Sequence, residues 1–135
     1  MPNAEAAVTE PAYTYRALVR RVIDGDTVEA DIDCGFHLVL RSRAIRLLGI
    51  NTPELHGDRA VAGQAARSYL VELLERYGTP DEDGWRVIVA TKLDRDDKYG
   101  RLLGTLWGRQ PAALEKAVNI NERMLAGGHA KAIAD

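Results

Sequence analysis

Apolar and polar positions alternate along the first third of the chain, which is typical of strands with one buried face. Two pairs of residues that favour tight turns, Asp24-Gly25 and Cys34-Gly35, interrupt the alternation. Further along, two shorter runs are apolar and bounded by polar residues. The pattern predicts strands from Tyr13 to the Asp24-Gly25 turn, over 27–32, over 37–48, over 85–91 and over 102–107.

The third predicted strand carries an arginine on the same face as several apolar residues, and this arginine points inward if that face is the core side. Successive side chains of a strand point to opposite faces, so Arg46 shares a face with Leu38, Leu40, Ala44 and Leu48. A buried, unpaired charge is costly, and an inward Arg46 would therefore need an anionic partner or ligand. The alternative is a bend or bulge that turns Arg46 to solvent, and the periodicity leaves both open.

Two segments repeat apolar residues every three or four positions, which predicts helices. The first stripe, which Gly78 to Pro80 ends, consists of Ala62, Ala65, Ala66, Tyr69, Leu70, Leu73 and Tyr77. A short second helix is expected from Asn119 to Ala126, before Gly127-Gly128. This order of elements indicates a mainly β, α+β domain, a five-stranded Greek-key barrel of the OB type with two to three packed helices. We expect the domain to span 12–135, after a disordered arm at 1–11.

Composition narrows the class of protein. The chain has 135 residues, a formal net charge of −2 and one cysteine, Cys34, which excludes an internal disulfide. The net charge argues mildly against nucleic-acid binding, although arginines gather in two stretches, 16–21 and 41–46. The first residues lack the pattern of a signal peptide, and no apolar run is long enough to cross a bilayer. We therefore expect a cytoplasmic, intracellular protein with no membrane partner, unless a leader has been removed, and we expect a monomer.

Polar residues cluster where predicted strands begin or end, in the segments 24–27, 46–54 and 96–101. If these segments converge at one end of a barrel, they bring together two arginines, several carboxylates and an amide. Arginine stabilises the negative charge that develops on phosphoryl oxygens. Hard divalent cations prefer carboxylate, amide and carbonyl oxygens, and a positioned carboxylate can take a proton from water. The pattern therefore favours phosphodiester cleavage.

The same three segments resemble the signature segments of the staphylococcal nuclease (thermonuclease) family. They are an Asp-Gly-Asp-Thr turn at 24–27, an Arg-Leu-Leu-x-x-(Asp/Asn)-Thr-Pro-Glu run at 46–54 and an Asp-Lys-Tyr-Gly-Arg run at 97–101. They occur in order and at similar spacing, with a helix between the second and the third. The resemblance implies a five-stranded OB barrel with three helices. It also implies a calcium-dependent endonuclease that cuts DNA and RNA and leaves 3′-phosphate ends.

For the metal site, the resemblance implies three ligands. Asp26 would bind calcium directly through its carboxylate, and Thr52 would contribute its backbone carbonyl. Asn51 stands where the family usually has a second aspartate. An amide oxygen can still coordinate, but the loss of a formal negative charge should weaken calcium binding and loosen the preference for calcium over other divalent cations.

For catalysis and substrate binding, the resemblance assigns five residues. Glu54 would orient or deprotonate the attacking water. Arg46 and Arg101 would bind the scissile phosphate, which favours an inward Arg46. Lys98 and Tyr99 would contact the neighbouring phosphate. The family's third helix has no counterpart in the sequence, and we expect it to be absent.

Two other functions remain open. One is a non-catalytic nuclease-like module that binds nucleic acid or a protein partner, and the presence of Arg46, Glu54 and Arg101 favours catalysis over it. The other is an OB-type single-strand binder, which would need more exposed aromatic residues and more positive charge. Asp24 is expected to serve only the turn. Trp85 and Trp107 are expected in the core.

Overall fold

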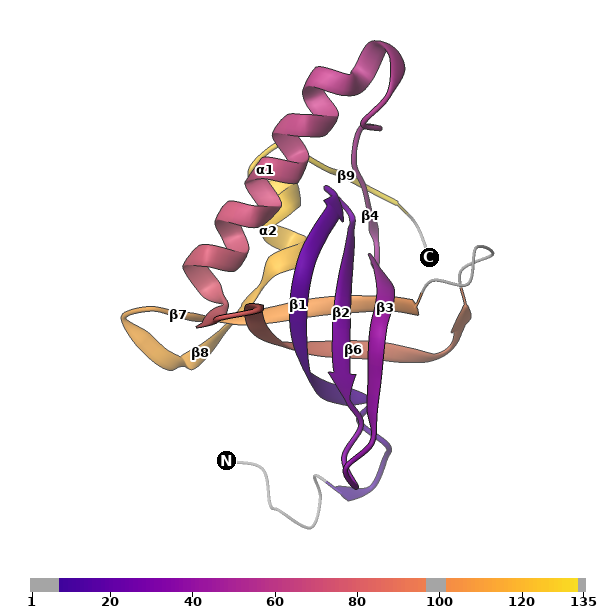
Figure 1. Ribbon diagram of the computed structural model, residues 1–135, viewed down its shortest axis with the longest axis vertical. Helices are drawn as coiled ribbons and strands as arrows, with labels where there is room; N and C mark the ends of the chain where they lie inside the picture. Colours follow the sequence, from indigo (N-terminus) through magenta and orange to yellow (C-terminus); the bar gives the residue numbers. More distant parts are fainter. Residues whose placement is uncertain (1–7, 97–101, 134–135) are drawn as a thin grey trace.

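The protein is a five-stranded barrel closed at one end by helices (Figure 1). The structure is a computed structural model that describes residues 8–96 and 102–133, with only the backbone described at 92–96. The pairing order is β6–β1–β2–β3–β7, and β6 also pairs with β7, which closes the ring. Only β3 and β7 pair in parallel within this ring. The predicted OB-type barrel is confirmed, with strands β1 (Thr14–Asp24), β2 (Thr27–Asp33), β3 (Val39–Leu47), β6 (Gly84–Asp96) and β7 (Leu102–Gln110).

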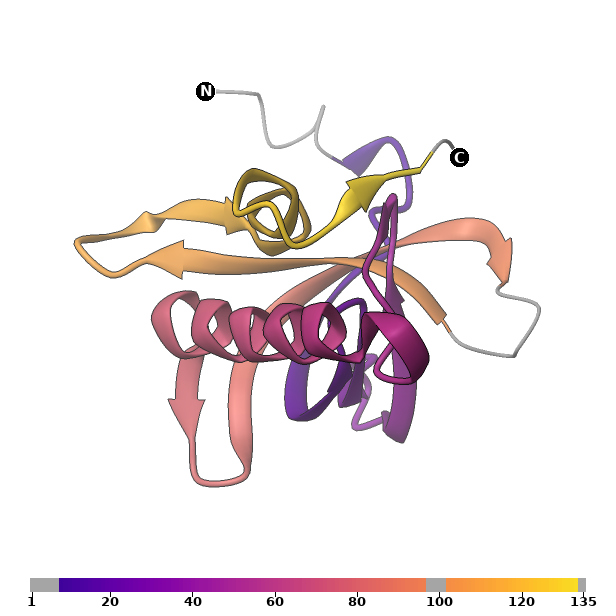
Figure 2. The same ribbon diagram turned by 90° about the horizontal axis from the view of Figure 1, so that it is seen from above.

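Two α-helices cover the barrel, α1 (Ala60–Tyr77) and α2 (Ile120–Ala126). They pack against each other and against β1 and β7 at the same end of the barrel (Figures 1 and 2). Both predicted helices are confirmed, and α1 ends before Gly78 as expected. Its buried face differs from the predicted stripe, because Ala62 and Ala65 are exposed whereas Gly63 and Leu74 are buried.

Several short elements lie outside the five barrel strands and were not predicted from the sequence. Strand β4 pairs with β9, β5 pairs antiparallel with β6, and β8 pairs antiparallel with β7 to form a hairpin. A 3-10 turn precedes α1. These elements are β4 (Ile50–Asn51), η2 (Gly57–Arg59), β5 (Thr79–Asp81), β8 (Ala113–Asn119) and β9 (Lys131–Ala132).

A β-bulge in β3 overturns the predicted core face of that strand. Leu38 is 62% exposed, whereas Ile45 and Leu47 are fully buried. The register between β2 and β3 shifts by one residue in the middle of the strand, where Ser42 has a positive φ of 55°. One extra residue reverses the alternation of faces. Of the two alternatives that the periodicity left open for Arg46, the bulge is the one present, and Ile45 and Leu47 on either side of Arg46 point into the core.

A buried aspartate holds this bulge in place. Oδ1 of Asp31 accepts a hydrogen bond from the Ser42 backbone N–H at 2.9 Å, and Oδ2 accepts one from Nε of Arg20 at 2.7 Å. Burial raises the pKa of Asp31, but the Ser42 N–H and the Arg20 guanidinium outweigh burial, and the pKa is lowered overall. The bulge that directs Arg46 away from the core thus rests on a carboxylate in β2.

The core fills the barrel and the space beneath the helices, and a buried amide links the two. The side chain of Asn121, 4% exposed, accepts from the Leu106 N–H and donates to the carbonyls of Leu48 and Gly104. It therefore fixes α2 to β7 and to the end of β3. No helix in the described part of the chain is long and apolar enough to cross a membrane. The expected arm at residues 1–7 lies outside the described residues.

Candidate active site

The β1–β2 turn, the end of β3 and the loop after β4 meet at one place. Thr27, the first residue of β2, pairs with Arg46, and the Leu47 N–H donates to the Asp26 carbonyl at 2.7 Å. The turn requires a glycine at position 25, since a Cβ there would lie 2.8 Å from Cβ of Ala66 on α1. Helix α1 therefore packs directly over the turn that carries Asp26.

Asp26 is the buried carboxylate of this site. It is 7% exposed. Its Oδ1 accepts from the Thr27 hydroxyl at 3.1 Å, and its Oδ2 accepts from the Thr52 N–H at 3.1 Å. Nη2 of Arg46 lies 3.6 Å from the same Oδ2. The structure thus brings two predicted site residues, Arg46 and Thr52, into contact with a third, Asp26.

Asp24 forms a carboxyl pair with Asp26, which the sequence did not predict. The expected turn role is present, because Oδ1 of Asp24 accepts from the Asp26 N–H at 3.0 Å. Burial, together with hydrogen bonding to the Asp26 carboxyl and its charge, raises the pKa of Asp24 to about 6. The pKa of Asp26 is lowered: burial raises it, but the hydrogen bond from Asp24 and the charge of Arg46 outweigh burial. The Asp-x-Asp spacing was visible in the sequence, but the burial that couples the two groups was not.

Oxygen acceptors hold the Arg46 guanidinium at the mouth of the site. Nη1 donates to the Leu47 carbonyl at 3.3 Å and to the Ile50 carbonyl at 3.0 Å. Nη2 donates to Oδ1 of Asn51 at 3.1 Å. The side chain is 15% exposed, so the choice left open by the periodicity is resolved: Arg46 points neither into the core nor into open solvent. It lies between the Asp26 carboxylate and the Asn51 amide.

Glu54 lies in the loop between β4 and η2, and its side chain is exposed. Helix α1 packs closely against the backbone of this loop at Gly63, where an added Cβ would lie 2.6 Å from the carbonyl carbon of Glu54. A small cavity of about 120 Å³ adjoins the loop, with Asn51, Thr52 and Arg59 in its wall. The close packing of α1 therefore sets the position of the Glu54 backbone relative to Asn51 and Thr52.

Three predicted site residues, Lys98, Tyr99 and Arg101, lie outside the described residues. The strand that follows them is described. Its first residues, Leu102 and Leu103, pair in parallel with Ile45 and Arg46. The start of β7 is therefore next to the part of β3 that carries Arg46.

Comparison with known proteins identifies the family. A family model described as Staphylococcal nuclease homologue matches residues 44–135. The chain belongs to this family. It is 31% identical to Protein ParB of Escherichia coli over 130 residues, which cover 94% of the chain and 63% of ParB. It is 32% identical to Thermonuclease of Staphylococcus intermedius over 93 residues, which cover 67% of the chain and 47% of that protein.

The family match assigns the chain a staphylococcal-nuclease-like domain. The chain spans less than two thirds of the length of either relative, at 63% and 47%. The family match begins at residue 44 and therefore includes Arg46, Asn51, Thr52 and Glu54, whereas the β1–β2 turn with Asp26 precedes it.

The candidate metal-binding groups of this nuclease homologue are oxygen donors, the kind of ligand that hard divalent cations prefer. Among residues 8–91 and 102–133, no three His, Cys, Asp or Glu side chains gather into a metal site. Oδ2 of Asp26, which is paired with Asp24, and Oδ1 of Asn51 both lie beside Nη2 of Arg46, and the Thr52 N–H donates to Asp26. Calcium and magnesium bind through such oxygens. The pair also supplies a second carboxyl group, which the sequence had assigned to the turn alone.

Proposed function

We propose that the protein is a divalent-cation-dependent endonuclease that hydrolyses phosphodiester bonds of DNA or RNA and leaves 3′-phosphate ends. Asp26, Asn51 and Thr52 are proposed as the cation ligands, with Asp24 beside them. Calcium is the expected cation, and other divalent cations are expected to substitute because Asn51 is neutral. Arg46, Glu54 and Arg101 are proposed as the catalytic residues, with Lys98 and Tyr99 binding the neighbouring phosphate.

The geometry of Arg46 carries this proposal. A guanidinium has five N–H donors, and three of them are used by the two carbonyls and the Asn51 amide. Two N–H groups are left without a hydrogen-bond acceptor among the described residues. Because the other three are fixed, these two, on Nε and Nη2, are held in one orientation, with Nη2 3.6 Å from Oδ2 of Asp26. A pre-positioned pair of N–H donors matches two oxygens of a phosphodiester.

The reaction requires one bond to form and one to break at phosphorus. The oxygen of a water molecule attacks phosphorus, and the P–O5′ bond breaks, so the phosphate stays on the 3′ side. Glu54 takes a proton from the attacking water, and the departing O5′ gains a proton to become a hydroxyl. Arg46 hydrogen-bonds to the phosphoryl oxygens and stabilises the negative charge that develops on them. A cation held by Asp26, Asn51 and Thr52 would supply further positive charge that stabilises the same transition state.

The alternative function is a nuclease-like module that binds nucleic acid or a protein partner without cutting. A substitution of Glu54 distinguishes this module from a nuclease, because a general base affects the rate of cleavage far more than the ground-state affinity for the substrate. Its side chain is exposed and has no hydrogen bond with the described residues, so its replacement by glutamine should leave the fold intact.

The test uses a fluorescent oligonucleotide with the wild type and the Glu54→Gln variant. We expect the wild type to cleave it in calcium and to stop in chelator. Glu54→Gln should lower the rate by ~10²- to 10⁴-fold, with unchanged anisotropy-measured affinity and an unchanged melting temperature. Phosphatase treatment of the products, followed by a gel, reports whether they end in a 3′-phosphate.

His56→Gln is the matched control, because His56 lies two residues away in the same loop and is also exposed. It should retain wild-type turnover. Wild-type turnover by Glu54→Gln would remove Glu54 from the mechanism. A wild type that binds but never cuts, in any divalent cation, would favour the non-catalytic module.

A further inference from the structure

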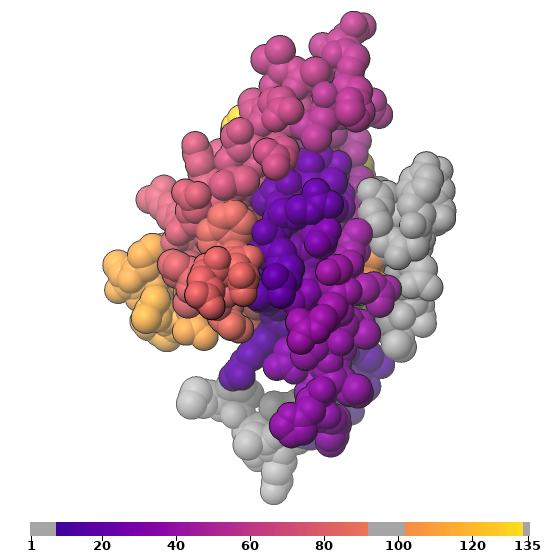
Figure 3. Space-filling view, in the orientation of Figure 1, coloured from indigo at the N-terminus to yellow at the C-terminus, as the bar shows by residue number. Residues whose placement is uncertain are grey.

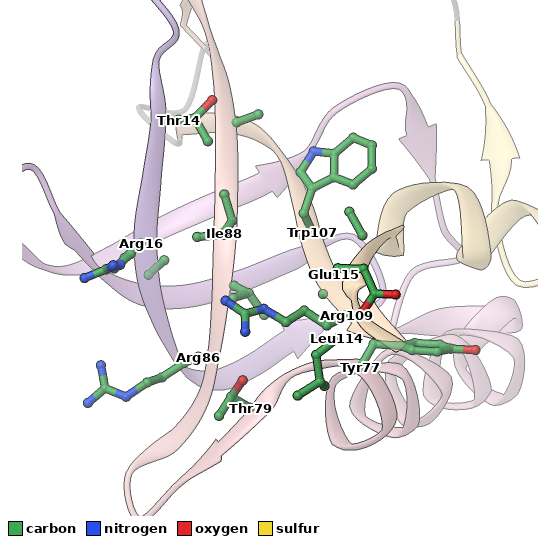
Figure 4. A pocket seen from close by; sticks show the side chains of 15 residues that line it. Thr14, Arg16, Tyr77, Thr79, Arg86, Ile88, Trp107, Arg109, Leu114 and Glu115 are labelled. Carbon is green, nitrogen blue, oxygen red and sulfur yellow. The ribbon is translucent and has the colours of Figure 1, made fainter. Parts of the chain in front are cut away.

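A groove lies on the outer surface of the barrel, and none of the residues that line it belongs to the candidate active site (Figure 4). It encloses about 870 Å³, and its wall is built from β1, β5, β6, β7 and β8 together with the end of α1. The barrel strands present their outward side chains to it, while Ala17 and Val87 between them are buried. In the space-filling view, the turn between β5 and β6 lies between β1 and the β7–β8 hairpin (Figure 3).

The groove is basic in a protein whose net charge is −2. Arg16, Arg86 and Arg109 line it, against a single acidic residue, Glu115. Arg86 is bound by Asp81 at 2.9 Å, but Arg16 and Arg109 make no ion pair or hydrogen bond within residues 8–91 and 102–133. Figure 4 shows Arg109 extending from β7 across the groove, with Arg16 and Arg86 on the side of β1 and β6. Two guanidinium groups are therefore available to an anionic ligand.

An aromatic side chain lines the same groove. Trp107 was expected in the core, but it is half-buried and is not part of the core cluster, whereas Trp85 packs against that cluster as expected. Its neighbours Leu106 and Gly108 are buried, so Trp107 stands on the outer face of β7. Leu114, 61% exposed, adds apolar surface at the edge of the groove.

We propose that this groove binds a single-stranded segment of the polynucleotide substrate outside the cleavage site, an inference that rests on the proposed nuclease function. Arg16 and Arg109 contact backbone phosphates, and Trp107 stacks on a base. Basic side chains combined with an exposed aromatic ring are the features that bind single strands without sequence preference. An acidic protein segment would use the arginines but would gain less from a flat indole surface.

The groove and the active site lie at opposite ends of β1. Arg16 and Asp24 are eight residues apart in this strand, which is at most ~26 Å at about 3.3 Å per residue. A strand that fills both sites therefore needs up to about eight nucleotides at the 3.4 Å spacing of a DNA strand. A dinucleotide reaches only the active site, so a comparison of long and short substrates distinguishes binding in the groove from binding at the active site.

The experiment measures binding and cleavage with a labelled 24-nucleotide oligothymidylate and with a dinucleotide. Binding is measured by anisotropy with Glu54→Gln protein in chelator, so that the probe is not cut. We expect Arg16→Ala and Arg109→Ala each to weaken binding of the long probe several-fold and to lower its salt dependence by about 0.7 in the log–log slope. Trp107→Ala should weaken it by about 5- to 150-fold. None of the three changes, made in the wild-type background, should alter cleavage of the dinucleotide.

Arg21→Ala is the matched control, because Arg21 is an exposed arginine on the same strand that does not line the groove. It should leave the salt dependence unchanged. Because Trp107→Ala also removes apolar surface, it is compared with Trp107→Phe, and thermal melts check that both variants fold. If Trp107→Ala fails to fold, the two arginine variants decide the outcome. Equal losses in Arg16→Ala and Arg21→Ala would overturn the proposal, as would equally tight binding of an oligoglutamate. If the wild type cuts neither probe, the proposed nuclease function fails, while binding of the long probe still tests the groove.

Discussion

Gly63→Ala tests whether the close packing of α1 sets the position of Glu54. An alanine in a helix is more favourable than glycine by ~1 kcal/mol, so propensity alone predicts a more stable protein. The structure predicts the opposite. The new Cβ would lie 2.6 Å from the carbonyl carbon of Glu54 and 3.0 Å from the Leu55 nitrogen, against 3.4 Å or more in ordinary contacts. The Glu54 carbonyl oxygen lies closer still, so the helix and the loop must separate by more than about 0.8 Å.

The size of the effect follows from this separation. Overpacking costs about 1–3 kcal/mol, which exceeds the gain in helix propensity by roughly 1 kcal/mol. For a chain of 135 residues, that lowers the melting temperature by about 4 °C. A displacement of nearly 1 Å at a catalytic carboxylate lowers kcat by about 10²-fold, because proton transfer depends on alignment. Substrate affinity should change little, since Arg46 is held by β3 and β4 rather than by this loop.

The assay combines a thermal melt with single-turnover cleavage of a labelled oligonucleotide. Gln64→Ala is the control, because Gln64 is the next residue of α1 and is exposed. It should retain activity and melt at or slightly above the wild-type temperature. A Gly63→Ala protein that is more stable than the wild type and equally active would refute the reasoning, since it would show that the loop moves without consequence for Glu54.

Three further predictions concern the carboxyl pair, Asn51 and Arg46. Asn51→Asp should bind calcium more tightly in a calorimetric titration, because it adds a carboxylate while keeping the acceptor for Arg46; equal or weaker binding would mean that position 51 does not contact the ion. The pKa of Asp24 is raised from 3.8 in the unfolded chain to about 6 in the folded protein. Ionised Asp24 therefore destabilises the folded protein; this destabilisation is absent below pH 3.8 and reaches its full size above about pH 6. Asp24→Asn should therefore be more stable than the wild type in metal-free melts at pH 7, with an advantage that disappears toward pH 4; an advantage that is constant with pH would contradict the coupling. Arg46→Ala should lower kcat by at least ~10²-fold with a much smaller change in KM, and a rise in KM at constant kcat would make Arg46 an ordinary binding group.

Local patterns in the sequence were sufficient for most of the regular elements. The alternation before and after the Asp24-Gly25 turn predicted β1 and β2, and the three-to-four-residue period predicted α1 with its end at Gly78. These predictions hold because the period of a strand or helix depends on neighbours close in the chain. The motifs also identified Asp26, Arg46 and Thr52, which the structure brings into contact. Whether Glu54, Lys98, Tyr99 and Arg101 act as proposed stays a prediction.

Tertiary contacts decided the features that the patterns could not reveal. The periodicity left the direction of Arg46 in β3 open, and a bulge braced by Asp31, on another strand, decided it by reversing the alternation. The Asp24–Asp26 pair depends on burial beneath α1, some forty residues away in the chain. Trp107 has the sequence surroundings of a core residue, yet ring closure leaves it on the outer face of β7, in the groove. In each case the outcome depends on which distant segment covers the residue, and a periodic pattern carries no information about that segment.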